Sequence, residues 1–374
     1  MKETIAQLAL HLSLIKGVGP GLCKRLHDAL GDNLHLLYTL NAKELGSFGF
    51  SEQTAQFIIS GLADRSALDQ EVNLLEKNNI SFVTLFDKNY PPLLKEIHLP
   101  PVVLYYKGPL SQQEALAVVG SRDANNYGHY AIEQFIPELV AHNFTIVSGG
   151  ALGADAMAHR ATLKAGGRTI VVLGSGLLKW YPATNQRLFQ SVLDNGGTLM
   201  SSFALETTPV PGNFPARNRI IAGLSRGCLV VQAAQESGAK ITALFALEQG
   251  REVFAVPGPI SDPLSAGCHS LIQQGAKLVH TAKDILAEFN LVPVQKIEAA
   301  QEKEKSSTVA EQITINFSLP LAQQIVQACI RPLSLDQLVE QLGSDLATCQ
   351  AAIFDLQLAG VLEQTLNGMW QKSV

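Results

Sequence analysis

The feature that most constrains the fold is a regular alternation of short apolar runs with helical stretches, which begins near Leu116. The runs are LAVVG, FTIVSGG, RTIVVLGSG, GGTLMSS, GCLVVQAA, REVFAVPG and AKLVH. Such alternation predicts βαβ units and a parallel, doubly wound sheet. The runs are nearly continuous in Val, Ile and Leu, as expected for strands that are buried on both faces. We therefore expect an α/β protein with a mostly parallel sheet.

Two further regions precede this stretch. Residues 1–65 carry apolar residues at helical spacing, broken by glycine turns at 17–19 and 46–49. Each turn opens a helical stretch, so the pair fits either a helix-hairpin-helix, which can hold DNA phosphates, or a plain helical bundle with glycine caps. Residues 66–110 predict a connecting segment with a helix and two strands, ISFVTLF and VVLYY.

The composition changes again after Phe289. Residues 291–317 are polar, charged and poor in large apolar residues, which predicts a flexible linker. Residues 318–374 predict three short helices and a hairpin at Asn367-Gly368, a type I′ turn signal. This order is the outline of a winged helix. The sequence thus predicts a helical domain, a connecting segment, a sheet domain at 111–290, a linker and a winged-helix-like domain.

The whole-chain charge does not indicate nucleic acid, because the formal net charge is −5. Any anion site must therefore be built from a local cluster. The five cysteines are scattered and form no CxxC pair, which argues against a disulfide framework or a zinc site and fits a reducing cytoplasm. No run of about 18 uncharged apolar residues occurs and the N-terminus has no clear signal-peptide pattern, so we expect a cytoplasmic protein without a membrane span.

Small residues follow several of the predicted strands. The turns are Gly120-Ser121-Arg122, Ser148-Gly149-Gly150, Gly174-Ser175-Gly176 and, a few residues after its strand, Ser237-Gly238. In a doubly wound sheet the ligand binds beyond the carboxyl ends of the strands. Glycine lets backbone N–H groups approach an anion, and helix N-termini attract negative charge. Four such turns at the carboxyl ends of the strands predict a phosphate or other anion site.

The hexapeptide from Phe214 to Arg219 is the most informative segment for the type of ligand. It places Arg217 and Arg219 near a predicted helix start, with Phe214 beside them and Asn218 between them. Arginines with one aromatic ring are a minimal set for single-stranded nucleic acid. The alternative is that Phe214 belongs to the core and the arginines form surface salt bridges.

Other ligands and reactions find less support. The chain contains no Gly-Lys-Ser/Thr, which excludes a Walker A site, and no strand–GxGxxG–helix unit with a following acid, which disfavours NAD. Asp155 and His159 lie one helical turn apart and could ligate a metal or act as an acid–base pair, but no third ligand follows. The helix dipole explains Asp155 more simply, and packing against the sheet explains His159. We therefore expect no catalytic residue, metal or cofactor.

Taken together, an ordered set of motifs over about 105–285 resembles the DprA/Smf family of bacterial DNA-processing proteins. The matching segments are VVGSR, SGGALGADAMAH, GGRTIVVLGSGL, the Tyr181-Pro182 pair, NFPARNRIIAGLS, SGAKITA and GREVFAVPGPI. The resemblance implies a non-catalytic protein with an extended Rossmann-like domain that binds single-stranded DNA. It also implies a SAM-like or helix-hairpin-helix-like front domain, a homodimer through the Rossmann-like domain, and delivery of the RecA recombinase in natural transformation or recombination.

The resemblance also assigns a strand-binding edge. Its residues would be Gly120, Ser121, Arg122, Ser148, Gly149, Gly150, Phe214, Arg217, Asn218, Arg219, Ser237, Gly238, Lys240 and Thr242. Leu152 stands where many relatives carry arginine, and Ser202 and Gln232 stand where acidic residues are common. Loss of an arginine removes a phosphate contact and loss of carboxylates lowers repulsion, so the net effect on affinity stays open.

Two alternatives to this function remain. A related Rossmann-like enzyme would bind nucleotides or cleave nucleoside monophosphates, and it should show a Pro-Gly-Gly-x-Gly-Thr turn followed by a catalytic glutamate. Here Pro257-Gly258 runs into Pro259-Ile260-Ser261. A purely structural adaptor would not need the arginines.

The C-terminal module has a separate prediction. The stretch from Pro332 to Gln371 contains no basic residue, so we hypothesise that the module binds a protein and not DNA. The alternative is a small structural domain with a solvated acidic face.

Overall fold

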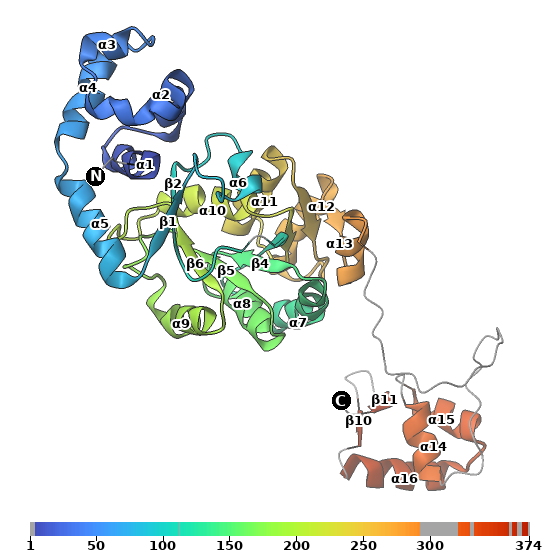
Figure 1. The fold of residues 1–374 in the computed structure, drawn as a ribbon. Coiled ribbons are helices and arrows are strands. Elements are labelled where there is room, and N and C mark those ends of the chain that lie inside the picture. The colour runs from blue at the N-terminus through green and yellow to red at the C-terminus, as the bar shows by residue number, and fades with distance from the viewer. Residues whose placement is uncertain are drawn as a thin grey trace, which may run out of the picture. The chain divides into compact units, whose positions relative to one another are not determined.

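The computed structural model describes residues 4–111, 113–291, 321–329, 333–358, 361–364 and 369–372 (Figure 1). The chain forms two units, Met1–Lys296 and Ile297–Val374. The predicted linker and the predicted Asn367-Gly368 turn lie outside the described residues, apart from position 291. The boundaries of the five predicted segments stay predictions.

A nine-stranded sheet forms the centre of the first unit, in the order β1-β2-β6-β5-β4-β3-β7-β8-β9. From β6 to β9 neighbouring strands are parallel, while β1 pairs with β2 and β2 with β6 in antiparallel fashion. This mixed α/β, mostly parallel, Rossmann-like sheet confirms the sheet part of the predicted fold class, and the SAM-like or helix-hairpin-helix-like character of the N-terminal helices stays a prediction. The strands are β1 (Ser81–Thr84), β2 (Val103–Lys107), β3 (Ala115–Val119), β4 (Thr145–Ser148), β5 (Thr169–Val172), β6 (Thr198–Ser201), β7 (Gly227–Val230), β8 (Glu252–Ala255) and β9 (Lys277–Leu278).

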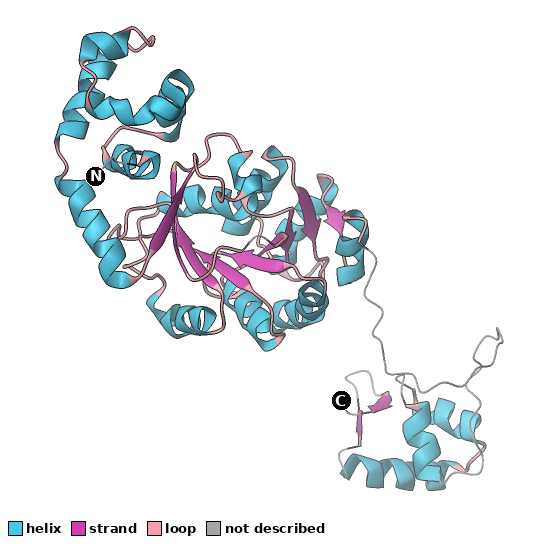
Figure 2. Ribbon diagram, in the orientation of Figure 1, coloured by secondary structure: helices cyan, strands magenta, loops and turns pink. Residues whose placement is uncertain are grey.

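Helices cover both faces of the sheet (Figure 2). Along β3, Leu116 and Val118 face a core shared with α7, α8 and α13, whereas Ala117 and Val119 face a core shared with α10, α11 and α12. Both faces of β3 are therefore buried, which explains its continuous apolar sequence. The helices are α6 (Pro92–Lys95), α7 (Asn126–Ala141), α8 (Ala154–Lys164), α9 (Gln186–Asp194), α10 (Asn213–Gly223), α11 (Gly238–Glu248), α12 (Ala266–Gln273) and α13 (Ala282–Glu288), with short 3₁₀ turns η2 (Ala183–Asn185) and η3 (Pro263–Ser265).

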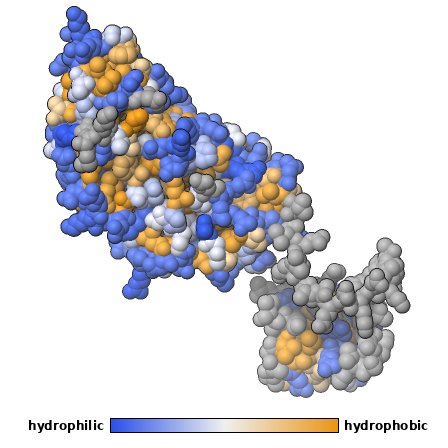
Figure 3. Space-filling view, in the orientation of Figure 1, coloured by the Kyte–Doolittle hydropathy of each residue, from blue (hydrophilic) through white to orange (hydrophobic). Residues whose placement is uncertain are grey.

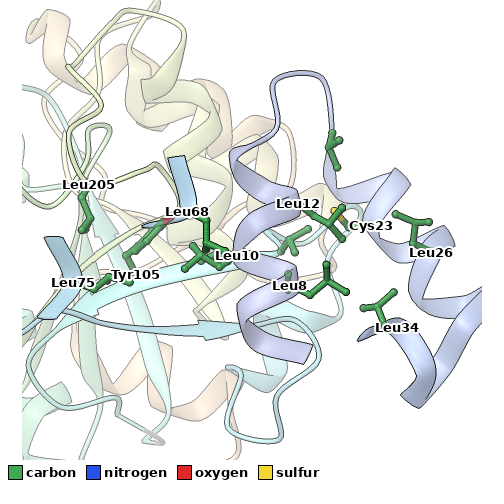
Figure 4. Close-up of a cluster of buried hydrophobic side chains, with 14 of the residues drawn as sticks. Leu8, Leu10, Leu12, Cys23, Leu26, Leu34, Leu68, Leu75, Tyr105 and Leu205 are labelled. Atoms are coloured by element: carbon green, nitrogen blue, oxygen red, sulfur yellow. The ribbon is translucent and has the colours of Figure 1, made fainter. Parts of the chain in front are cut away.

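The N-terminal helices pack on the β2 end of the sheet through one apolar cluster (Figure 4). Helix α1 is the centre of this cluster, because Leu8 and Leu12 on one side of the helix and Leu10 on the other are all fully buried. Tyr105 of β2 joins the same cluster, so the helices and the sheet share a core. The elements are α1 (Ile5–Leu14), α2 (Pro20–Leu30), η1 (Gly31–Tyr38), α3 (Ala42–Gly46), α4 (Glu52–Ala63) and α5 (Ser66–Asn78).

The predicted connecting segment contributes directly to the sheet. Strands β1 and β2 pair with each other, and β2 continues the sheet beyond β6. Hydrophobic and hydrophilic residues are interspersed over the face of the first unit in Figure 3. Among the helices that the structure describes, none is both long and apolar enough to cross a membrane.

The second unit contains α14 (Leu321–Ala328), α15 (Leu335–Leu342) and α16 (Leu346–Leu358), followed by the antiparallel pair β10 (Leu362–Gln364) and β11 (Trp370–Lys372). A small core holds it together, with Ile325, Leu338 and Ile353 from the three helices. The order of three helices and a two-stranded ladder agrees with the predicted outline, and its assignment as a winged helix stays a prediction.

Candidate nucleic-acid interface

A cleft of about 590 Å³ lies at the carboxyl end of β3, between α10 and α11. We call it the main cleft. It lies where the strand order reverses, because β4, β5 and β6 extend the sheet on one side of β3 and β7, β8 and β9 extend it on the other; this reversal is the usual ligand position in such sheets. Most of the predicted site residues line it: Gly120, Ser121, Arg122, Phe214, Arg217, Asn218, Ser237, Gly238 and Thr242.

Arg122 is the exposed cation of the main cleft. It lies three residues after the end of the buried strand β3, and its side chain lines the cleft. Its guanidinium carbon lies 5.8 Å from the centre of the Phe214 ring. Because this guanidinium is exposed, it can contact a phosphate without any rearrangement of the protein core.

Arg217 is buried, with 5% of its surface exposed. Its Nη1 donates to the carbonyl oxygens of Gly149 and Val172, the latter at 2.6 Å, and its Nε donates to the side chain of Asn218 at 3.0 Å. Burial lowers the pKa of Arg217 to about 10, partly offset by the charge of Asp155, so the side chain stays protonated at neutral pH. It joins the ends of β4 and β5 to α10 and presents its remaining edge to the cleft.

The loop after β4 lies mainly behind the cleft. Ser148, Gly149 and Gly150 are buried, and the Ser148 hydroxyl donates to the Val118 carbonyl at 2.6 Å. The carboxylate of Asp155, in the first turn of α8, accepts hydrogen bonds from the backbone of Gly149 at 3.1 Å. An internal carboxylate therefore occupies the backbone donor of Gly149, and the role of this loop in DNA binding stays a prediction.

Asp155 and His159 are both buried and form hydrogen bonds inside the protein. Burial raises the pKa of the Asp155 carboxyl, while the Arg217 charge and backbone donors lower it. The Thr169 hydroxyl donates to the Ile146 carbonyl at 2.7 Å, so it accepts from Nδ1 of His159, also at 2.7 Å. Burial lowers the pKa of His159 to about 3. Among the described residues, no group of three or more His, Cys, Asp or Glu side chains could hold a metal ion.

Two predicted cations lie away from the main cleft. Arg219 donates to the His98 carbonyl at 3.2 Å and lines a separate cavity of about 310 Å³ next to α1 and β2. The reason is helical phase: two residues along an α-helix rotate a side chain by about 200°, so Arg217 and Arg219 point to opposite sides of α10. Lys240 donates to the Gln235 carbonyl at 3.0 Å and is not among the residues that line the cleft.

The N-terminus of α11 also lines the main cleft. The Ser237 hydroxyl caps this helix by accepting from the backbone of Ala239, and the next residue, Gly238, is exposed. Thr242 is buried one turn later. A helix N-terminus carries a partial positive charge, which favours an anion in the cleft.

The side-chain charges of the cleft nearly balance. Arg122 and Arg217 line it, but so do Asp123, Asp155 and Glu236. Anion binding here therefore depends on where the guanidinium groups and the helix N-terminus point, not on a net positive charge.

A smaller space of about 60 Å³ adjoins the main cleft, and we call it the aromatic slot. Leu152, Tyr181, Pro182 and Phe214 form its apolar walls, with Arg122, Gly149, Ala151 and Arg217 completing the lining. The rings of Tyr181 and Phe214 are 5.9 Å apart and tilted by 46°. The Phe214 ring also packs against Gly174, where an added Cβ would lie 2.9 Å from it.

Sequence reasoning did not place Leu152 or Tyr181 in the site. Both lie on loops, and both were visible only as part of the family motifs, Leu152 as a departure and Tyr181 in the Tyr-Pro pair. Of the other departures, Gln232 is buried and bonds Asn125 and Asp262, which fixes the start of α7. Ser202 lines the same cavity as Arg219.

Known proteins share this fold and sequence. A family model described as DNA recombination-mediator protein A matches residues 81–290. The Smf protein of Synechocystis is 34% identical over 96% of this chain and 97% of its own length. The DNA processing protein DprA of Streptococcus pneumoniae is 48% identical over 55% of this chain and 73% of its own length.

Two solved structures are also similar. DNA processing protein A from Streptococcus pneumoniae has a TM-score of 0.67 and 37% identity, over 77% of this chain and 99% of its own. The protein from Helicobacter pylori has a TM-score of 0.51 and 26% identity, over 56% of this chain and 95% of its own, and was described for its unique single-stranded DNA binding mode. The sequence and the fold therefore agree that this chain belongs to the DprA/Smf family of DNA recombination-mediator proteins.

Proposed function

We propose that this chain binds single-stranded DNA in the main cleft and acts in DNA processing during recombination. The observation that supports this is the meeting of Arg122, the Phe214 ring and the N-terminus of α11 at one edge of the sheet. Guanidinium groups and helix N-termini attract phosphates, and an accessible ring gives a base a stacking partner. The single-stranded DNA binding described for the Helicobacter pylori relative supports the same function.

We infer binding and not catalysis. The acid–base pair that the sequence suggested is engaged inside the protein: Asp155 accepts backbone hydrogen bonds, and His159 is fully buried against Thr169. The competing nucleotide-cleaving enzyme would need a carboxylate that faces the substrate beside a phosphate-binding glycine turn. At the corresponding turn, the Pro257 carbonyl instead accepts from the Tyr127 hydroxyl.

We further propose that protein partners bind the sheet-bearing unit, namely a second copy of this chain and the RecA recombinase. An exposed apolar stripe on α11 supports such a contact, since Ile241, Leu244 and Leu247 leave 39%, 48% and 46% of their surface exposed. Sedimentation of the chain alone and after addition of RecA would separate the two partners. A monomer that does not bind RecA would contradict both.

For the second unit we propose a protein-binding role. Its helix α16 carries no basic side chain, so it lacks the charges that a helix in the DNA major groove uses. Leu346 and Phe354 on this helix are 50% and 59% exposed, which supports a protein contact. The single-strand affinity of the first unit should therefore not depend on α16. The substitution Phe354→Ala should leave DNA affinity unchanged in a binding titration, and a marked loss would contradict this role.

The test of the proposed function is a gel shift with single-stranded and double-stranded oligonucleotides across a salt series. We expect tighter binding of the single strand, weakened by salt because phosphate contacts release counterions. A structural adaptor would bind neither strand, and a nucleotide-cleaving enzyme would release a base from a nucleoside monophosphate. Either result would contradict the proposal.

A further inference from the structure

Two apolar residues of the aromatic slot are exposed to solvent. Leu152 and Tyr181 each leave 46% of their surface exposed, and they belong to the loops after β4 and β5. Leu152 comes from the loop before α8, Tyr181 from the loop after β5 and Phe214 from α10. Apolar side chains that gather in one partly exposed patch mark interaction or ligand-binding surfaces.

The dimensions of the slot suit one flat ring. Its 60 Å³ is room for about five water molecules, which is the space of a single planar ring system and less than that of a whole nucleotide. The guanidinium carbons of Arg122 and Arg217 lie 5.8 and 5.9 Å from the Phe214 ring, so cations stand beside the aromatic wall. Both arginines also line the main cleft, so one ligand can occupy both spaces.

We propose that the aromatic slot takes one unstacked nucleobase from the strand whose phosphates occupy the main cleft, with Tyr181 as a base-stacking residue. This inference rests on the proposed function and adds a binding site for a base to the phosphate site in the main cleft. Stacking on a ring tolerates any base, because every base has a π-face. A base in a duplex must first leave its pair and its stack, so the slot also selects single strands over duplexes.

Leu152 adds apolar surface to the slot. Its side chain is 46% exposed and lines the slot together with Tyr181 and Phe214. An apolar lining favours the face of a base over a charged phosphate.

The test compares a labelled oligothymidylate with a strand of the same length made of abasic nucleotides, by fluorescence anisotropy with the full chain. The matched control is Tyr130→Ala, the same truncation at a tyrosine of α7 that is 61% exposed and does not line the slot. We expect Tyr181→Ala to weaken binding of the oligothymidylate between about fivefold and about 150-fold. Tyr181→Phe keeps the ring and should bind as the unchanged chain does.

The abasic strand separates base stacking from phosphate binding. The unchanged chain should bind it more weakly than oligothymidylate, and Tyr181→Ala should cause no further loss on it. If Tyr181→Ala also lowers the melting temperature, Leu152→Ala tests the slot at a second lining residue, whose exposed side chain contributes little to the core. Equal binding of both strands by the unchanged chain, or an equal loss on both strands in the variants, overturns the slot and leaves the main cleft intact. Failure of the unchanged chain to bind either strand overturns the proposed function as well.

Discussion

Replacement of Arg122 by alanine should weaken single-strand binding and its dependence on salt without unfolding the protein. Arg122 is exposed, lines both the main cleft and the aromatic slot, and follows a buried strand that does not depend on its side chain. Arg219 offers a matched control, because it comes from the predicted hexapeptide but points to another cavity on the far side of α10. The two variants remove the same charge from the same unit.

The magnitude follows from counterion release. On a single strand each phosphate contact contributes about 0.7 to the slope of log affinity against log salt. A fourfold rise in salt is about 0.6 decades, so one contact changes the affinity by about 2.6-fold over that range. Arg122→Ala should therefore bind more weakly at low salt and lose about 2.6-fold less affinity over a fourfold rise in salt than the unchanged chain.

The assay is fluorescence anisotropy with a single-stranded oligonucleotide at a series of salt concentrations. Arg219→Ala should keep the slope of the unchanged chain. The reasoning is refuted if Arg122→Ala keeps both slope and affinity, or if Arg219→Ala flattens the slope while Arg122→Ala does not. Thermal melting of each variant shows whether the fold is intact.

Four other predictions follow from the same contacts. Phe214→Ala should cost about 1–3 kcal/mol of single-strand binding in the anisotropy assay, and a lower melting temperature with intact affinity would show that the ring only packs. Gly149→Ala should destabilise the fold by about 1–3 kcal/mol in thermal melts, because its Cβ would meet the guanidinium of Arg217. The pKa of His159 is about 3 when folded and near 6.5 when unfolded, so its contribution to stability is complete above about pH 6.5 and is lost as the pH falls toward 3; His159→Gln should remove this part of the pH dependence of the melting temperature. A chain ended at Lys296 should keep its single-strand affinity within a few fold by gel shift, and a loss beyond about tenfold would show that the second unit contacts DNA.

The sheet was predictable because a strand that is buried on both faces has an almost continuously apolar sequence. β3 reads Ala-Leu-Ala-Val-Val because alternate residues face two different helical layers. The place of the cleft was also predictable, since ligands in such sheets bind at the carboxyl ends of the strands. These two inferences need only local composition and a general rule of topology.

The roles of individual polar residues were less predictable, because they depend on three-dimensional contacts. Arg217 and Arg219 look equivalent in sequence, yet helical phase buries one against strand-end carbonyls and sends the other to a different cavity. The backbone donor of Gly149 looked available to a ligand, but Asp155 from the next helix already uses it. Tyr181 lies on a loop with no periodic pattern, so its approach to Phe214 required the folded structure.

The most direct test of the central claim is photocrosslinking of a thiothymidine-containing single strand to the full chain, followed by mass-spectrometric mapping of the attached peptides. A strand in the main cleft should attach to peptides that contain Arg122, Tyr181 or Phe214, and an unlabelled single strand should compete for this attachment more strongly than a duplex. Attachment confined to the N-terminal helices or to the second unit, with the cleft peptides unmodified, would contradict the account.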